Sequence, residues 1–405
     1  MRCLLVHNYY QRGGGEDEVF RSERELLRSA GHKVLEYVCR NDEIHEYDIW
    51  NKITLGLRTV WAWDRARELR EILRNEEPHV VHFHNTLPLI SPAAYYTCQE
   101  AGVPVVQTLH NYRLFCPAAT FLREGRPCEE CTSHSLLRSI RYGCYRDSRS
   151  ATAAVSAMLK FHRLGQTWAT KVDAYICLGE FQRSKLVAAG LPSERAFVKP
   201  NFVSPDPGMR TPTSQPETAI FVGRLSPEKG LFTLLRAWEK VSRDIRLRII
   251  GDGDLRADLE QWKSKRGLGH VFLEGHQPRP DVVAAMKTAR FLLFPSELYE
   301  CFPITILEAF ASGLPVVASR LGAMAEIVDD GRTGLHFTPG DAEDLAAKVE
   351  WAWNHPEEME VMGRNARAEY EAKYTAERNY RILLRIYETA IARSRGATVP
   401  DTRAE

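Results

Sequence analysis

Short apolar runs alternate with helical stretches along most of the chain, and this alternation constrains the fold more than any other feature. Residues 2–7 read as a buried strand, Gly13-Gly14-Gly15 follows, and a helical pattern runs from Glu16 to Ala30 and ends at Gly31. Strand, glycine turn and helix form the first unit of a doubly wound α/β domain. Further strands are predicted over 34–38, 80–83, 103–109, 174–177, 196–199, 219–222, 247–250, 271–273, 291–294 and 316–318, with helices over 57–75 and 91–101.

The alternation stops once and then restarts. Residues 204–217 hold four prolines and no core-forming run, which is typical of a domain linker. A chain of 405 residues is also too long for one ordinary core. Because right-handed crossovers make such alternation a parallel sheet covered on both faces, we expect an α/β fold with two Rossmann-like domains, 1–203 and 218–375. Ligands of open sheets bind outside the strand carboxyl ends, so the site is expected in a cleft between the domains.

Bulk composition excludes several classes of protein. The chain is 44% hydrophobic and 26% charged with a net charge of +1, which gives no support to nucleic-acid binding. Charged residues follow the first apolar run too soon for a signal peptide, and no apolar run approaches the roughly 20 residues of a membrane span. The sequence therefore predicts a cytoplasmic protein with mostly reduced cysteines.

The stretch from Ser296 to Ala311 carries the first chemical signal. Glu300 falls in the loop after a predicted strand, and Glu308 falls about one turn inside a helix that Pro303 can start. Free N–H groups at a helix N-terminus attract anions and sugar oxygens, so the two carboxylates could hold a polyhydroxylated, phosphorylated ligand. The alternative is that both are ordinary surface residues. The apolar character of the helix around Glu308 weakens that alternative, because an unpaired charge there is expensive.

A second signal opens the second domain, at Gly223–Gly230. A strand ends at Gly223, Arg224 follows, and Lys229 stands at the start of a helix. A guanidinium can fork onto phosphate oxygens and an ammonium adds a mobile point charge, so the pair suits a diphosphate. The alternative is that these two basic residues pair with Glu228 on the surface.

Several motifs taken together resemble one known family. The sequence is similar to the retaining glycosyltransferases of family four (glycosyl transferases group 1), and the resemblance covers nearly the whole chain. It rests on Gly13-Gly-Gly-Glu16, Val81-His-Phe-His84-Asn85, Thr108-Leu-His110-Asn111, Gly223-Arg-Leu-Ser-Pro-Glu-Lys-Gly230, Gly251-Asp-Gly-Asp254 and the stretch from Glu300 to Glu308. The resemblance implies the GT-B fold and a C-terminal helix, 376–393, that packs back on the first domain, before a disordered tail at 394–405.

The resemblance also implies roles for individual residues. Arg224 and Lys229 would bind the donor diphosphate, Glu308 the ribose, and Glu300 the donor sugar. His110 would lie near the reacting centre. Other donor contacts would come from Gly14, Gly15, His276, Gln277, Phe302, Ile304 and Thr305. One departure is that Cys301-Phe302-Pro303 replaces the Gly-Phe-Gly of many members, and Pro303 has no N–H to offer the sugar.

The implied activity is transfer of a hexose from a UDP- or GDP-linked sugar to a glycan or lipid-linked acceptor, with retention, in cell-surface polysaccharide biosynthesis. We expect no catalytic cofactor, because Arg224 and Lys229 can stabilise the departing diphosphate in place of a metal. Two alternatives stay open: a nucleotide-sugar 2-epimerase and a non-catalytic scaffold that binds sugar nucleotides. The complete set of Arg224, Lys229, Glu300 and Glu308 favours the transferase.

Cysteine spacing adds a separate hypothesis. Cys128 and Cys131 form a two-residue-spaced pair, with Cys116 and Cys144 on either side, in a segment without a strong apolar pattern. Four thiolates suit a structural zinc; ordinary free cysteines, a redox pair or an iron–sulfur cluster are the alternatives. His82 and His84 point to one face of a strand, but no third ligand stands beside them in the sequence, which favours packing or an acceptor role.

The segment 138–163 is basic, with apolar residues interleaved. This pattern predicts either a seat for an anionic, lipid-linked acceptor with peripheral membrane contact or a solvated helix face beside the cleft.

Overall fold

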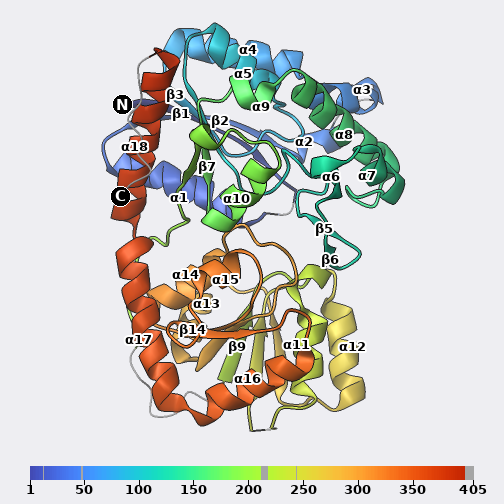
Figure 1. Ribbon diagram of the computed structural model, residues 1–405, viewed down its shortest axis with the longest axis vertical. Helices are drawn as coiled ribbons and strands as arrows, with labels where there is room; N and C mark the ends of the chain where they lie inside the picture. Colours follow the sequence, from blue (N-terminus) through green and yellow to red (C-terminus); the bar gives the residue numbers. More distant parts are fainter. Residues whose placement is uncertain (12, 47–48, 211–217, 243, 397–405) are drawn as a thin grey trace. The chain divides into compact units, whose positions relative to one another are not determined.

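The computed structural model describes residues 1–11, 13–46, 49–210, 218–242 and 244–396 (Figure 1). The chain forms two compact units. Of the described residues, 1–123, 128–200 and 377–396 belong to the first unit, and 124–127 and 201–376 belong to the second. In the described ranges, no helix is both long enough and apolar enough to cross a membrane.

A parallel six-stranded sheet, in the order β2-β1-β3-β4-β7-β8, organises the first unit. Its central strands β3, β4 and β7 are buried along their whole length, and most of their residues are apolar, with His82, Gln107 and Thr108 as buried polar exceptions. The strands are β1 (Arg2–Tyr9), β2 (Lys33–Arg40), β3 (Val80–Phe83), β4 (Val105–Thr108), β7 (Ala174–Cys177) and β8 (Ala196–Val198), with a small hairpin of β5 (Leu122–Arg123) and β6 (Arg126–Pro127).

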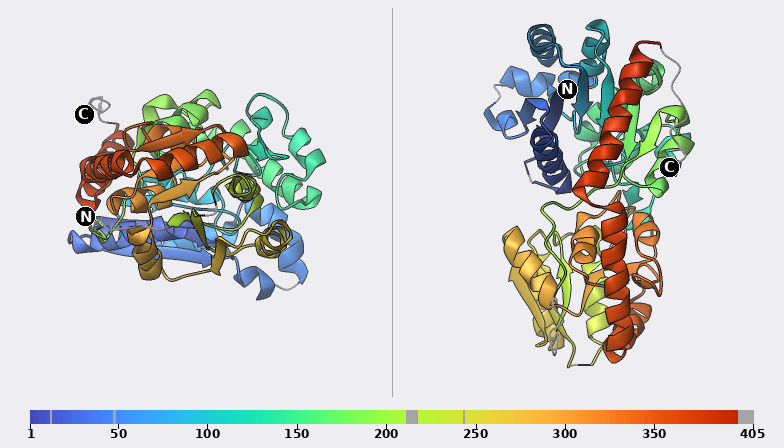
Figure 2. Two further views of the ribbon diagram at one scale, coloured as in Figure 1. Left: turned by 90° about the horizontal axis from the view of Figure 1, so that it is seen from below. Right: turned by 90° about the vertical axis from the view of Figure 1, so that its left-hand side faces the viewer.

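Helices cover this sheet, and the last helix of the chain is one of them. They are α1 (Gly15–Ser29), α2 (Glu43–Glu46), α3 (Ile49–Val60), α4 (Trp63–Glu76), α5 (Ala93–Glu100), α6 (Glu130–Ser133), α7 (Leu137–Tyr142), α8 (Arg149–Leu164), α9 (Thr167–Thr170), α10 (Glu180–Ala188) and α18 (Ala376–Ser394). Leu383, Ile386 and Tyr387 of α18 share a core cluster with Cys3 and Leu5 of β1. Figure 2 (right) shows α18 lying along this unit. The C-terminal helix is thus part of the first unit's core.

The second unit repeats this architecture. Its six-stranded parallel sheet has the order β11-β10-β9-β12-β13-β14. The strands are β9 (Thr218–Val222), β10 (Arg246–Ile250), β11 (Val271–Gly275), β12 (Phe291–Phe294), β13 (Val316–Ser319) and β14 (Gly334–Phe337). The helices are α11 (Leu231–Trp238), α12 (Arg256–Arg266), α13 (Arg279–Thr288), α14 (Ile304–Ala311), α15 (Ala323–Ile327), α16 (Ala342–Asn354) and α17 (Pro356–Lys373).

The predicted fold class is confirmed as two six-stranded parallel α/β sheets. The single helix predicted over 57–75 is wrong, because α3 ends at Val60 and α4 begins at Trp63. The sequence analysis also missed β14. Residues 211–217 of the predicted linker and 397–405 of the predicted tail lie outside the described residues, and a site between the two units stays a prediction.

Candidate functional site

The chemistry-bearing residues of the second unit gather where β9 and β12 end. Lys229 closes a 3₁₀ turn (Pro227–Lys229) after β9, and Glu300 lies in the loop after β12. The Lys229 ammonium donates a hydrogen bond to Glu300 Oε1 over 2.6 Å, and the Ser296 hydroxyl donates to the same oxygen over 2.8 Å. Glu228 instead accepts from the Ser226 hydroxyl at 2.6 Å. The surface pairing of Lys229 with Glu228, the alternative left by the sequence, is therefore not formed.

Glycines let the loops at this edge of the sheet touch through their backbones. Gly230 has φ +71°, and a Cβ there would lie 1.9 Å from the carbonyl oxygen of Pro295, which follows β12. At Gly251, after β10, a Cβ would lie 1.9 Å from the carbonyl oxygen of Gly223. Since backbone atoms cannot yield to such an overlap, both positions require glycine. This close packing is what brings Lys229 beside the loop that carries Glu300.

Glu308 is the fifth residue of α14, and its side chain is 12% exposed. The guanidinium of Arg279, the first residue of α13, lies 3.0 Å from Glu308 Oε1. The sequence analysis missed Arg279, although a basic residue that opens a helix just after a strand end was a usable signal. The expectation that Pro303 lies in the helix is corrected: Pro303 is the extended residue before α14, which begins at Ile304.

The remaining predicted donor residues lie on loops of the same sheet edge. Arg224 is exposed directly after β9, and His276 is exposed after β11. Ile304 and Thr305 are half-buried at the start of α14, and Phe302 is buried just before it. The Gln277 amide donates to Glu274 Oε2 at 2.8 Å, so its side chain is engaged within the protein. Its backbone is the part left to contact a base.

In the first unit, Gly14 is the N-cap residue of α1 and Gly15 opens that helix. The buried carboxylate of Asp17 holds this turn, since it accepts from the Gly14 N–H at 3.2 Å and lies 2.8 Å from His7 Nε2. The predicted glycine turn therefore presents backbone at the start of a helix.

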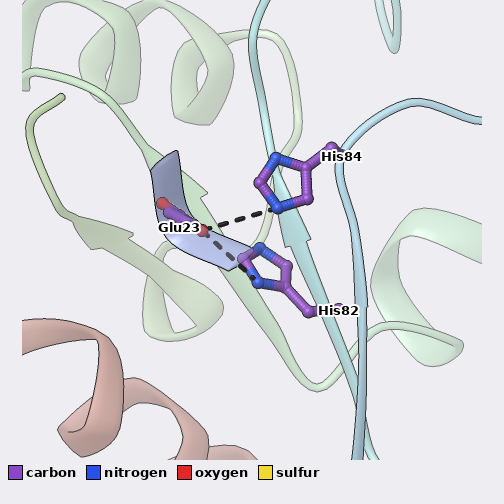
Figure 3. Close-up of side chains that lie close together, drawn as sticks. All are labelled: Glu23, His82 and His84. Carbon is purple, nitrogen blue, oxygen red and sulfur yellow. Dashed lines mark ion pairs between the residues drawn. The ribbon is translucent and has the colours of Figure 1, made fainter. Parts of the chain in front are cut away.

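A buried polar cluster lies between α1 and the end of β3 (Figure 3). Glu23 of α1, His82 of β3 and His84 just after β3 place one potential ligand atom each within 4.8 Å of one another. The sequence analysis found no third group beside the two histidines, and the structure corrects this, because Glu23 reaches them from another element. Glu23 also forms a buried ion pair with Lys199, whose ammonium donates to Asn379 Oδ1 of α18 at 3.2 Å.

The donor set of this cluster fits a structural network better than a metal. Both ring nitrogens of His82 are engaged at 2.8 Å, Nδ1 with the Tyr387 hydroxyl and Nε2 with the Thr108 hydroxyl. The Lys199 ammonium already neutralises Glu23 and would repel a cation. Burial lowers the pKa of His82 to about 4, so this ring is neutral near pH 7. The network instead ties α18 to the sheet through Tyr387 and Asn379.

His110 follows β4 and joins the same cluster. Its Nε2 lies 3.0 Å from His84 Nδ1, and His84 Nε2 lies 3.4 Å from Glu23 Oε2. Burial, reinforced by neighbouring histidines, holds the pKa of His84 and of His110 well below the ordinary value. His84 Nε2 and Glu23 Oε2 are close to each other but do not form a hydrogen bond.

Comparisons with known proteins agree with this arrangement. The description "Glycosyltransferase Family 4" matches residues 13–207, and "Glycosyl transferases group 1" matches residues 210–369. The D-rhamnosyltransferase WbpZ of Pseudomonas aeruginosa is 34% identical over 163 residues, 40% of this chain and 42% of that protein. The alpha-D-kanosaminyltransferase of Streptomyces kanamyceticus is 27% identical over 78% of this chain and 80% of its own. The chain spans less than half the length of WbpZ.

Solved structures show the same fold. Anabaena HepE, crystallised in complex with UDP, superposes with a TM-score of 0.67 at 18% identity, covering 96% of this chain and 99% of that one. The two family matches and the shared fold define the class of protein as glycosyltransferases that use a nucleotide-sugar donor. This chain belongs to the family-four glycosyltransferases of group 1.

Proposed function

We propose that the protein transfers a hexose from a nucleoside diphosphate sugar to an acceptor hydroxyl with retention of anomeric configuration. The observation that carries this proposal is the hydrogen-bonded pair of Lys229 and Glu300 at the carboxyl ends of β9 and β12. A phosphate-binding cation and a hydroxyl-binding carboxylate stand side by side there. A diphosphate joined to a sugar needs these two groups next to each other.

Each remaining residue has a role in this proposal. Lys229 and Arg224 bind the diphosphate, helped by the N-terminus of α11, since N–H groups at a helix start favour anions. Glu300 accepts from hydroxyls of the donor sugar, and Glu308 accepts from those of the ribose. The base lies against backbone at 276–277, and the start of α14 at 302–305 contacts the sugar and phosphate.

In the first unit, Gly14 and Gly15 approach the diphosphate and His110 lies near the reacting centre. UDP bound to HepE supports a nucleoside diphosphate as the ligand class, and the donor here is UDP- or GDP-linked.

The reaction breaks the bond between the anomeric carbon and the β-phosphate oxygen. The acceptor hydroxyl attacks from the same face, and its proton passes to the departing phosphate oxygen, so the products are a glycoside and a nucleoside diphosphate. Negative charge develops on the diphosphate as the bond breaks. Arg224 and Lys229 are placed to stabilise that charge, which is the type of interaction that contributes most to rate. Catalysis in this proposal requires no metal.

The acceptor is a glycan or a lipid-linked glycan of a cell-surface polysaccharide. Support comes from α7 and α8, which pack together: α7 carries exposed Leu137 (71%), Arg138 and Arg141, and α8 ends at exposed Leu164 (77%). Apolar side chains next to cations suit an anionic membrane surface. Flotation with phosphatidylglycerol vesicles at low salt should recover the protein, and recovery should fall at high salt. Protein that stays at the bottom of the gradient at low salt counts against membrane contact.

Product analysis tests the proposed activity. The protein is incubated with UDP- and GDP-sugars and with alkyl glycosides or extracted lipid-linked sugars, and products are followed by mass spectrometry and proton NMR. A new glycoside with the anomeric configuration of the donor supports the proposal. A donor sugar epimerised at C2 would assign the protein to the isomerases instead, and bound donor with no turnover would favour a scaffold.

A further inference from the structure

Four cysteines lie in the segment that joins β4 to α8. Cys116 follows a turn after β4, Cys128 follows β6, Cys131 lies in α6, and Cys144 follows α7. Regular structure is sparse here, with two-residue strands and helices of 4 and 6 residues. A segment of this kind buries little apolar surface of its own and needs another source of order.

Polar contacts link the short strands and helices of this segment. Arg163 of α8 donates to the carbonyl oxygens of Cys131 (3.0 Å) and Phe115 (2.9 Å), which brings Cys131 close to the residue before Cys116. Arg123 of β5 pairs with Glu130 of α6 at 2.7 Å, and its guanidinium lies 4.4 Å from the ring centroid of Tyr142 in α7. These contacts bring the turn before Cys116, the helix that contains Cys131 and the helix just before Cys144 into one neighbourhood.

All four cysteines are free thiols, and Cys116 is buried while Cys128, Cys131 and Cys144 are half-buried. None of them is committed to a disulfide, so all four remain available as ligands.

Two cations are positioned to balance the charge of such a site. Four thiolates and one Zn²⁺ carry a net charge of −2. Arg163 lies against the backbone of Cys131, and Arg123 lies against Tyr142, two residues before Cys144. Arg163 holds backbone carbonyl groups of the segment, and Arg123 holds the side chains of Glu130 and Tyr142. The same two side chains therefore supply positive charge near the thiolates and hold the segment in place.

We propose that Cys116, Cys128, Cys131 and Cys144 bind one structural Zn²⁺ as a tetrahedral set of four thiolates. The Cys-x-x-Cys pair with one distant cysteine on either side is a spacing that suits such a site. Zinc–sulfur bonds of about 2.3 Å require sulfurs about 3.8 Å apart. Among the described residues only Glu23, His82 and His84 have three ligand atoms within 4.8 Å of one another. The four sulfurs are thus farther apart than a bound ion requires, and the proposal needs the cysteine side chains to rotate toward one another. The thiol protons pass to solvent.

A zinc ion at this site would restrain the loop of the first unit that carries His110. Cys116 lies six residues after His110, on the same connection from β4, and its N–H donates to the Tyr112 carbonyl at 2.9 Å. A metal that holds Cys116 therefore restrains the loop carrying His110. The metal site itself does not depend on the proposed glycosyl transfer, because it can be measured without any substrate.

Metal content of the full-length protein, purified under reducing conditions without chelator, tests the proposal. We expect about one zinc per chain in the wild type and in Cys98→Ser, a matched control in which a buried cysteine of α5 is changed. Cys131→Ser should lose the metal. Because Cys131→Ser can fail to fold, Cys128→His provides a second variant. Imidazole also ligates zinc, so Cys128→His should retain metal where Cys128→Ser does not.

A measurement on the wild type avoids variants altogether. Titration with an organomercurial should release zinc to a metallochromic indicator as four thiols react, and protein expressed with cobalt should show thiolate-to-cobalt charge-transfer absorption. Metal-free wild type with four freely reactive thiols would overturn the proposal. A disulfide between Cys128 and Cys131, or iron with inorganic sulfide in place of zinc, would overturn it equally.

Discussion

Lys229 Nζ and Glu300 Oε1 lie 2.6 Å apart, although the two residues are 71 positions apart in the chain. The Lys229 side chain is 23% exposed and that of Glu300 is 13% exposed, so the pair is shielded yet still reaches the surface. Ser296 fixes the same carboxylate oxygen from the other side. The pair places a cation next to a carboxylate that accepts hydrogen bonds. The proposed site for the sugar donor rests on this arrangement.

Removing the Lys229 ammonium should slow the reaction more than it weakens donor binding. The Lys229→Ala variant loses a group that stabilises the departing diphosphate, and it leaves Glu300 without its cation. We expect kcat/KM to fall by an amount equivalent to ~2–4 kcal/mol, the scale seen for removed oxyanion donors. Steady-state kinetics with the donor identified by product analysis measures this. An unchanged kcat/KM would remove Lys229 from the mechanism.

A double-mutant cycle then separates the ion pair from the phosphate contact. If Lys229 acted only by holding Glu300, the Lys229→Ala change would cost nothing further in a Glu300→Gln background. Our account predicts that most of its cost persists there.

Glu308 and its partner Arg279 should affect nucleotide affinity in the same direction. Glu308→Ala removes the proposed ribose anchor, and a hydrogen bond to a charged group contributes about 1.5–3 kcal/mol. Arg279→Ala should weaken binding less, because it frees the carboxylate to move without removing it. Calorimetry with the nucleoside diphosphate measures both. Glu343→Gln, which changes an exposed carboxylate paired with Lys240, is the control and should bind normally; equal affinity in Glu308→Ala would refute the ribose role.

Acid should destabilise the first unit through its buried histidines. His82 faces Glu23 of α1, Lys199 after β8, Tyr387 of α18 and His84 just after its own strand. Burial lowers its folded-state pKa to about 4, below the unfolded value of 6.5. As the pH falls below 6.5, the unfolded chain gains a proton that the folded protein does not, so stability is lost down to about pH 4 and is fully present above 6.5.

This histidine alone should lower the free energy of unfolding by about 2 kcal/mol between pH 7 and pH 5. Thermal unfolding monitored across this range should show a falling midpoint. The decisive quantity is the slope of the unfolding midpoint against pH, rather than the midpoint itself. His82→Gln, whose amide does not titrate, should reduce this slope. An identical slope in His82→Gln would show that this ring does not set the pH response.

Periodicity predicted most of the strands well, because short buried runs such as Phe291–Phe294 carry their own signal. It was less successful for the helices. The break between α3 and α4 has no proline or glycine at Trp61 and Ala62 that would mark it. Strand β14 was not predicted because it begins with Gly334 and contains His336, so that only two of its four residues are apolar.

The candidate site, too, could be predicted only in part from the sequence. Lys229, Glu300 and Glu308 belong to motifs that are continuous in sequence. Their pairings are not: Arg279 reaches Glu308 from a different helix, and Lys229 pairs with Glu300 rather than with the neighbouring Glu228. The buried set of Glu23, Lys199 and His82 joins three distant elements. These groups meet only in the folded chain, so no pattern within one segment could predict their contacts.

Titration calorimetry with UDP- and GDP-sugars, in the presence of EDTA, tests the central claim most directly. The account predicts that one nucleotide sugar binds the wild type in EDTA and binds Glu308→Ala more weakly. Failure of every donor to bind, or equal binding by the wild type and Glu308→Ala, would contradict a donor site at the carboxyl ends of β9 and β12.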